Sequence, residues 1–132
     1  MIIAIMKAVI LAAGKGKRMK PLTIKKPKPL VKVRGRTFLE HILNALPLSV
    51  DEVIIVIGYK GRMIKDFLGE SHDGKKITYV VNDKISLGPA HSLILTRPYF
   101  KKGERFLLVY ADELVTKKEV RDCLSHKFSW LS

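Results

Sequence analysis

Four apolar runs recur along the chain and are separated by longer, more polar segments. The runs are rich in valine, isoleucine and leucine, a composition typical of strands that are buried on both faces of a sheet. The clearest run ends at Gly58, and the first leads into Gly14. This pattern predicts strands at residues 7–12, 52–57, 77–81 and 106–110.

The segments between the runs place apolar residues at helical spacing. Thr37 and Glu40 form a capping box ahead of an apolar stripe that stops at Pro47. Thr116 and Glu119 form a second capping box, which predicts that the last helix begins there. The pattern predicts helices at residues 37–46, about 63–68, 89–96 and from 116 onward.

Alternating strands and helices predict an α/β fold with a mainly parallel sheet in a three-layer αβα arrangement. Ligands of such sheets bind at the carboxyl ends of the strands. Three polar features follow strands in this sequence: the basic loop after residue 12, Asn82 and Asp112. We therefore expect all three at one edge of the sheet.

The chain has 132 residues, of which 47% are hydrophobic, so it is long enough for one domain with a buried core and too short for two. The apolar start, residues 1–13, is interrupted by Lys7 and lacks a basic leading region, so it resembles neither a signal peptide nor a membrane span. The single cysteine, Cys123, cannot form an internal disulfide, and we expect it to pack within the last helix. These features predict one cytoplasmic domain over residues 1–132, without membrane association.

The formal net charge is +13, and the first fifty residues hold eleven basic residues and one acidic residue. Between Gly14 and Arg36, ten residues are Lys or Arg and none is acidic. This excess makes nucleic-acid binding a rival function. The basic stretch lacks interleaved aromatic residues for base stacking, and the sequence contains no helix-turn-helix, zinc-finger or RNP pattern. Nucleic acid is therefore the less favoured partner.

The loop after the first strand has a composition suited to a polyphosphate. Gly14 and Gly16 permit a sharp turn and bring backbone N–H groups close to a ligand, and Lys15, Lys17 and Arg18 add positive charge. The loop lacks the Gly-Lys-Ser/Thr ending of a P-loop and the third glycine of the dinucleotide fingerprint. The alternative is an ordinary surface turn with solvated lysines.

Residues 11–23 resemble the signature of the sugar-phosphate nucleotidyltransferases, Leu-Ala-Ala-Gly-x-Gly-x-Arg-Met/Leu-x-Pro-Leu-Thr. The family's later Lys-Pro-Leu/Met is matched at residues 28–30, and the resemblance extends to about residue 126. It implies the Rossmann-like nucleotide-binding half of such an enzyme, with a four-stranded sheet in the order 3-2-1-4. It also implies that Arg18 and Lys28 bind the phosphates of the nucleotide and the transition state. The resemblance assigns nucleotide binding to Leu11, Ala12, Ala13, Gly14, Gly16 and Lys17.

Two further segments are similar to the family's motifs. Asn82 and Gly88 lie in a stretch that resembles the base-reading segment, although Asn82 replaces the family's glutamine and Pro89 replaces its threonine. Asp112 follows the last predicted strand, where a carboxylate could bind Mg²⁺ beside a polyphosphate. Ala111 replaces the glycine that precedes this aspartate in the family, and a solvated acid at a strand end is the alternative for Asp112.

The resemblance implies that a phosphate oxygen of a sugar 1-phosphate, or a similar phosphorylated acceptor, attacks the α-phosphorus of a nucleoside triphosphate and releases pyrophosphate. Catalytic domains of the family are longer than this chain, and their later half supplies most of the acceptor site. We therefore expect a complete nucleotide-binding half. Two alternatives remain open: a nucleotide-binding module without turnover and a basic nucleic-acid-binding domain.

The order 3-2-1-4 leaves residues 106–110 at an edge of the sheet. This run contains no charge, proline or glycine, so it lacks the usual features that protect an exposed edge strand. We expect a second copy of the chain, or the apolar tail at residues 128–131, to cover this strand. The sequence thus predicts a homo-oligomer formed through the last strand, or a tail that folds back over it.

Overall fold

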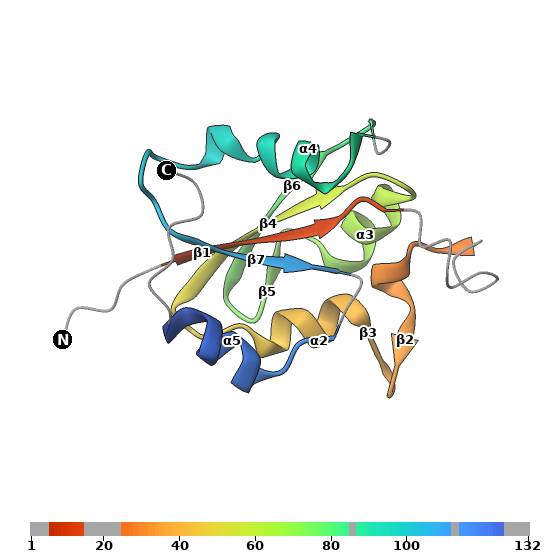
Figure 1. The fold of residues 1–132 in the computed structure, drawn as a ribbon. Coiled ribbons are helices and arrows are strands. Elements are labelled where there is room, and N and C mark those ends of the chain that lie inside the picture. The colour runs from red at the N-terminus through yellow and green to blue at the C-terminus, as the bar shows by residue number, and fades with distance from the viewer. Residues whose placement is uncertain (1–5, 15–24, 85–86, 112–113, 126–132) are drawn as a thin grey trace.

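The computed structural model describes residues 6–14, 25–84, 87–111 and 114–125. A central sheet has helices on both faces, with α4 (Pro89–Ile94) above it and α2 (Phe38–Ala45) and α5 (Lys117–Ser125) below it in Figure 1. This arrangement confirms the predicted three-layer α/β fold class. No helix in the described part of the chain is long and apolar enough to cross a membrane.

The sheet contains four parallel strands in the predicted order. β1 (Met6–Ala12) pairs on one side with β4 (Val50–Ile57) and on the other with β7 (Phe106–Tyr110), and β4 pairs with β6 (Lys75–Val81). A fifth strand, β5 (Ser71–His72), runs antiparallel beside β6 and was missed. The full order is therefore β5-β6-β4-β1-β7, which corrects the four-stranded prediction.

Two tight hairpins were not predicted because each involves very short strands. One joins β5 to β6 through Asp73 and Gly74, with φ of 47° and 80°. The other joins β2 (Lys32–Val33) to β3 (Arg36–Thr37) through Arg34 and Gly35, with φ of 54° and 81°. Two positive φ values in succession match a type I′ turn, in which glycine is favoured. Both glycines thus allow the chain to reverse within two residues.

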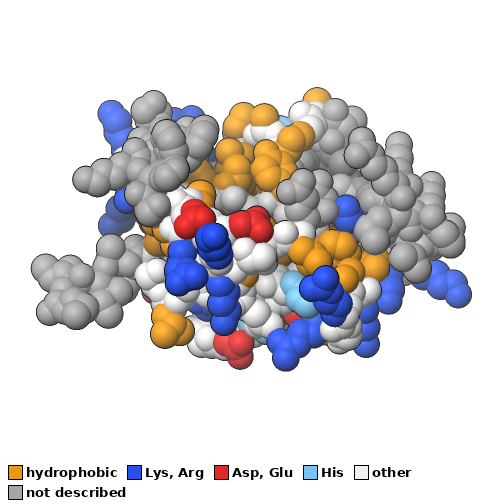
Figure 2. Space-filling model, turned by 60° about the horizontal axis from the view of Figure 1, so that its bottom comes forward, with side chains coloured by type: hydrophobic (Ala, Val, Ile, Leu, Met, Phe, Trp, Pro, Cys, Tyr) orange, Lys and Arg blue, Asp and Glu red, His pale blue; other side chains and the backbone are white. Residues whose placement is uncertain are grey.

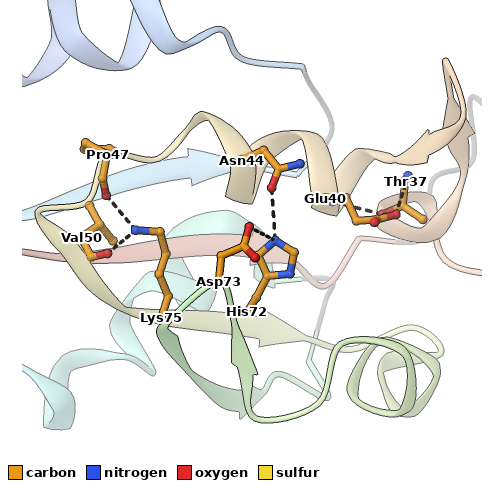
Figure 3. Close-up of polar contacts among 8 residues, drawn as sticks. All are labelled: Thr37, Glu40, Asn44, Pro47, Val50, His72, Asp73 and Lys75. Atoms are coloured by element: carbon orange, nitrogen blue, oxygen red, sulfur yellow. Dashed lines mark hydrogen bonds and ion pairs between the residues drawn. The ribbon is translucent and has the colours of Figure 1, made fainter.

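The predicted capping box of α2 is present. Thr37 Oγ1 accepts a hydrogen bond from the Glu40 backbone N–H at 3.1 Å, and Glu40 Oε1 accepts one from the Thr37 backbone N–H at 3.1 Å (Figure 3). α3 (Gly61–Leu68) begins two residues before the predicted start and ends at residue 68, as predicted, and Gly69 follows with a φ of 73°. The helix expected at 89–96 stops at Ile94 and is followed by a short 3-10 turn, η4 (Arg97–Tyr99).

The core lies on both faces of the sheet. Residues of α2, α3 and α5 pack on one face, whereas Leu93 of α4 packs on the other. Cys123 is exposed, so the expectation that it packs inside the last helix was wrong. The apolar stripe of α5 is narrow, because only Val120 and Leu124 face the core and Cys123 falls beside them. The largest fully buried side chains include Ile10, Leu39, Ile42, Leu43, Ile54, Ile55 and Ile64.

Candidate functional site

The end of β1 brings the start of the predicted phosphate loop to the carboxyl edge, the edge of the sheet at which β1, β4, β6 and β7 end. Leu11, Ala12 and Ala13 are 9%, 3% and 5% exposed, so this approach to the loop is fixed in the core. The Ala111 N–H donates to the Leu11 carbonyl at 3.0 Å. Ala111 therefore lies directly beside the start of the loop, and Asp112 is the next residue along the chain.

Gly14 is exposed at this edge, and a Cβ added there would meet nothing within 4 Å. The remaining predicted loop residues, Gly16, Lys17 and Arg18, lie outside the described residues, as does Asp112. Among the described residues, no group of three or more His, Cys, Asp or Glu could hold a metal ion. A single carboxylate at residue 112 fits Mg²⁺, which commonly uses one or two carboxylates together with phosphates and water.

Backbone hydrogen bonds join the ends of the neighbouring strands. The Asn82 N–H donates to the Ile57 carbonyl at 2.8 Å, and the Tyr59 N–H donates to the Ala13 carbonyl at 3.4 Å. The segments that follow β1, β4 and β6 are therefore in direct contact. This contact brings Ala13, at the start of the predicted loop, close to Asn82, as expected from the parallel order.

The Asn82 side chain is 1% exposed and makes hydrogen bonds inside the chain. Its Nδ2 donates to Ser92 Oγ at 2.7 Å, and its Oδ1 accepts from the Lys84 N–H at 2.9 Å. These two bonds connect the end of β6 to α4 and to the loop between them. Ser92 was not singled out in the sequence, because a serine within a helix usually faces solvent. The structure makes it a buried partner, with 4% of its surface exposed.

Gly88 is the N-cap residue immediately before α4 and has a φ of 83° and a ψ of 179°. Residues other than glycine rarely adopt this conformation, because a Cβ clashes with the local backbone. Pro89 occupies the first turn of the helix, as predicted, where its missing N–H is not needed. Gly88 therefore lets the chain turn sharply from the loop after Asn82 into α4.

Lys28 begins a short 3-10 turn, η2 (Lys28–Leu30), between two buried prolines. Its Nζ lies 5.6 Å from the centre of the Phe38 ring, within the range of a cation–π contact. Pro27 has a φ of −69° and a ψ of 153°, so the chain enters this turn in an extended conformation. The Lys28 side chain is half-buried, and the prolines on either side of it restrict the backbone.

A hollow of about 670 Å³ lies elsewhere, at the opposite ends of the strands. It is formed by the end of α2, the turn between β5 and β6, and α5, and includes Leu48, Lys117 and Arg121. Figure 2 shows a face of the molecule on which basic side chains lie among acidic and apolar ones. None of the predicted site residues lines the hollow, so we do not assign the nucleotide site to it.

Lys75 lines the same hollow and has a structural role. Its Nζ donates to the carbonyl oxygens of Pro47 and Val50, which anchors the start of β6 to the start of β4 (Figure 3). Burial lowers the pKa of the Lys75 ammonium, and the nearby Asp51 and Asp73 partly oppose that effect. Lys75 makes both hydrogen bonds to backbone carbonyls of the same fold, so its lowered pKa does not indicate a second active site.

Known proteins are similar to this chain in both sequence and fold. The chain is 32% identical over 122 residues to the Bifunctional protein GlmU of Methanococcus maripaludis, a match that covers 92% of this chain and 28% of GlmU. It is 36% identical over 110 residues to the UTP–glucose-1-phosphate uridylyltransferase AglF of Haloferax volcanii, covering 83% of this chain and 44% of AglF. The chain thus spans less than half the length of these relatives.

A solved structure has a similar fold. The inositol-1-phosphate CTP transferase from T. maritima superposes with a TM-score of 0.72 at 28% identity, and the match covers 98% of this chain and 51% of that protein. The model of the family described as the MobA-like NTP transferase domain matches residues 8–128. That range includes β1 from residue 8 onward, the other strands of the sheet and the segments that follow the strands at the carboxyl edge. The chain therefore belongs to the family of MobA-like NTP transferase domains.

Proposed function

We propose that the protein binds a nucleoside triphosphate at the carboxyl edge and takes part in transferring its nucleoside monophosphate to a sugar 1-phosphate or a similar phosphorylated acceptor. An acceptor phosphate oxygen forms a bond to the α-phosphorus, the bond to the bridging oxygen breaks, and pyrophosphate leaves. The observation that carries this proposal is the junction of the buried Leu11–Ala13 segment with the strand end at Ala111 and the segment at Asn82. The names of the relatives support the reaction type.

The chain's own residues would act by positioning and by stabilising charge. Gly14, Gly16 and Lys17 provide a close approach of backbone N–H groups to the phosphates, and Arg18 and Lys28 provide positive charge. An attacking phosphate is already an anion, so the reaction needs no general base. The proposed site can therefore work with glycines and cationic side chains and needs no catalytic histidine.

The segment from Asn82 to Gly88 is proposed to form the base side of the pocket. The Asn82 side-chain amide is hydrogen-bonded to Ser92 and Lys84, so it contributes by holding this segment in place. The left-handed φ of Gly88 then turns the chain towards α4. Base recognition in this proposal comes mainly from the shape and backbone groups of the loop.

We propose Asp112 as the ligand of Mg²⁺. When bound, Mg²⁺ neutralises phosphate charge that the cationic side chains leave uncompensated. Ala111 is 3% exposed and its N–H is bonded to Leu11, so the backbone that carries the carboxylate begins from a fixed point. The proposed place of action is the cytoplasm, because the lone Cys123 gives no sign of an oxidising compartment.

Assembly through β7 is part of the proposal. Among the described strands, β7 pairs only with β1, and it forms an edge of the sheet. Tyr110 is 47% exposed, and Phe106 and Leu108 are half-buried on the same side of the strand. An apolar strand edge of this kind readily pairs with another chain. We expect light scattering after size-exclusion chromatography to give a mass above 14.9 kDa, whereas a monomer at micromolar concentration would contradict assembly between copies.

A nucleotide-binding module without turnover is the second candidate. It requires only the junction of the Ala13, Ala111 and Asn82 segments, which is the part of the site that the described residues form. Both candidates require the same nucleotide site. They differ only in whether pyrophosphate is released when an acceptor is added.

The test is calorimetric titration with each common nucleoside triphosphate, with and without Mg²⁺, followed by a pyrophosphate-release assay with sugar 1-phosphates. Arg18→Ala should weaken nucleotide binding about ten- to a hundred-fold, because a hydrogen bond to a charged group contributes about 1.5–3 kcal/mol. Lys102→Ala is the control, since it removes an exposed cation near the start of β7, at the opposite ends of the strands. Equal affinities for Arg18→Ala, Lys102→Ala and wild type would refute the proposed site.

A further inference from the structure

Gly58 lies where three segments of the carboxyl edge meet, immediately after β4. A Cβ built on this residue would lie 2.8 Å from the Asn82 carbonyl oxygen, 3.0 Å from the Ala13 carbonyl oxygen and 3.1 Å from the Ala13 Cβ. The φ of Gly58 lies outside the left-handed region, so an alanine could adopt its backbone conformation. The requirement for glycine at this position is therefore purely a matter of space.

The atoms around Gly58 cannot move aside as a flexible side chain could. Two of them are backbone carbonyl oxygens, and ordinary contacts of a Cβ begin at about 3.4 Å. Hydrogen bonds hold both segments in place, from Tyr59 to Ala13 and from Asn82 to Ile57. A methyl group would thus push the start of the glycine loop and the Asn82 segment apart by several tenths of an ångström.

We infer that Gly58 is a positioning residue of the nucleotide site, because its missing side chain sets how closely the loop that starts at Ala13 approaches the Asn82 segment. This inference rests on the proposed function and deepens it. The two segments would hold opposite parts of one nucleotide, the phosphates and the base. Their separation therefore sets the fit of the nucleotide without any direct contact from Gly58.

Gly61 provides a matched control three residues away. A Cβ there would also lie at 2.8 Å from its nearest neighbour, and its φ is likewise outside the left-handed region. However, its three nearest atoms all belong to the Ile57 side chain. Gly61→Ala therefore presses first on the Ile57 side chain and perturbs the packing of α3 on the sheet, whereas Gly58→Ala presses first on the Asn82 and Ala13 carbonyl oxygens.

The experiment compares Gly58→Ala and Gly61→Ala in two measurements. Urea unfolding reports the stability of each variant, and nucleotide dissociation constants are then measured at a temperature at which both variants remain folded. Amide spectra of the ligand-free proteins report whether Ala13, Gly14 and Asn82 have moved. Each of the common nucleoside triphosphates is used as a probe with Mg²⁺.

We expect Gly58→Ala to weaken nucleotide binding about tenfold or more, since displacements of this size in a positioned site are costly. Gly61→Ala should lose stability yet bind the nucleotide within about twofold of wild type, because the atoms nearest to the added methyl group belong to the Ile57 side chain. Equal affinity losses in the two variants, or unchanged affinity in Gly58→Ala, would overturn the inference. If wild type binds no nucleotide, the proposed function fails, and displaced Ala13 and Asn82 amides in Gly58→Ala alone would still support its role in spacing.

Discussion

Replacing Asn82 separates a structural role of its amide from direct contact with the nucleotide. Asn82→Ala removes the donor to Ser92 Oγ at 2.7 Å and the acceptor of the Lys84 N–H at 2.9 Å. Each hydrogen bond contributes about 0.5–1.5 kcal/mol net, and a buried partner left without a bond costs more. We therefore expect Asn82→Ala to lower the free energy of unfolding by about 2–3 kcal/mol in the absence of nucleotide.

A double-mutant cycle isolates the bond to Ser92. Ser92→Ala alone should cost about 1–2 kcal/mol, because it leaves the buried Asn82 Nδ2 without its partner. The double variant should be more stable than the sum of the single losses predicts, by about 1 kcal/mol. Urea unfolding followed by circular dichroism gives all the required free energies under one set of conditions.

Two results would refute this account of Asn82. Additive losses in the double variant would mean that the Asn82 amide does not interact energetically with Ser92. A fully stable Asn82→Ala protein with weakened nucleotide affinity would mean that the amide serves the ligand. In that case the base contact implied by the sequence resemblance would be the better explanation.

The remaining predictions concern the capping box, the buried lysine and the metal. Thr37→Ala should cost about 1 kcal/mol in urea unfolding, as expected for loss of a helix cap. The Thr37 N–H holds the pKa of Glu40 below its usual value of 4.5. The contribution of Glu40 to the free energy of unfolding is therefore complete above pH 4.5 and is lost as the pH falls below that value. Stability curves of wild type and Glu40→Ala that stay equally far apart in acid would contradict this. Lys75→Met should cost about 2 kcal/mol by removing two hydrogen bonds from a charged group, and an unchanged urea midpoint would disprove that role. Asp112→Asn should abolish the Mg²⁺ dependence of nucleotide affinity in calorimetry, whereas the same Mg²⁺ effect in variant and wild type would exclude it as the ligand.

The main elements could be predicted from the sequence because local pattern and tertiary packing agree there. Residues 53–57 are apolar throughout, and the structure buries this part of β4 in the middle of the sheet. The box formed by Thr37 and Glu40 set the start of α2 correctly because its two hydrogen bonds are local. β5 was missed because two residues carry no alternation, although the Asp73-Gly74 pair offered a turn signal.

The convergence of the strand ends at one edge could be predicted from the sequence, whereas the side-chain contacts there could not. The parallel order brings the ends of β1 and β6 together, which depends only on the succession of strands and helices. The bond between Asn82 and Ser92 depends on how α4 lies over the sheet, and no local pattern reports that. The crowding around Gly58 is also nonlocal, since the atoms closest to its missing Cβ belong to Ala13 and Asn82.

Amide chemical-shift mapping during titration with a nucleoside triphosphate and Mg²⁺ tests the central claim most directly, because it locates the ligand on the fold. The account predicts that the largest changes occur at the carboxyl edge, at Gly14, Gly58 and Ala111, while the amides of Lys117 and Arg121 beside the opposite hollow stay unchanged. Changes confined to those two residues and their neighbours, or no changes with any nucleotide, would contradict a nucleotide site at the carboxyl edge.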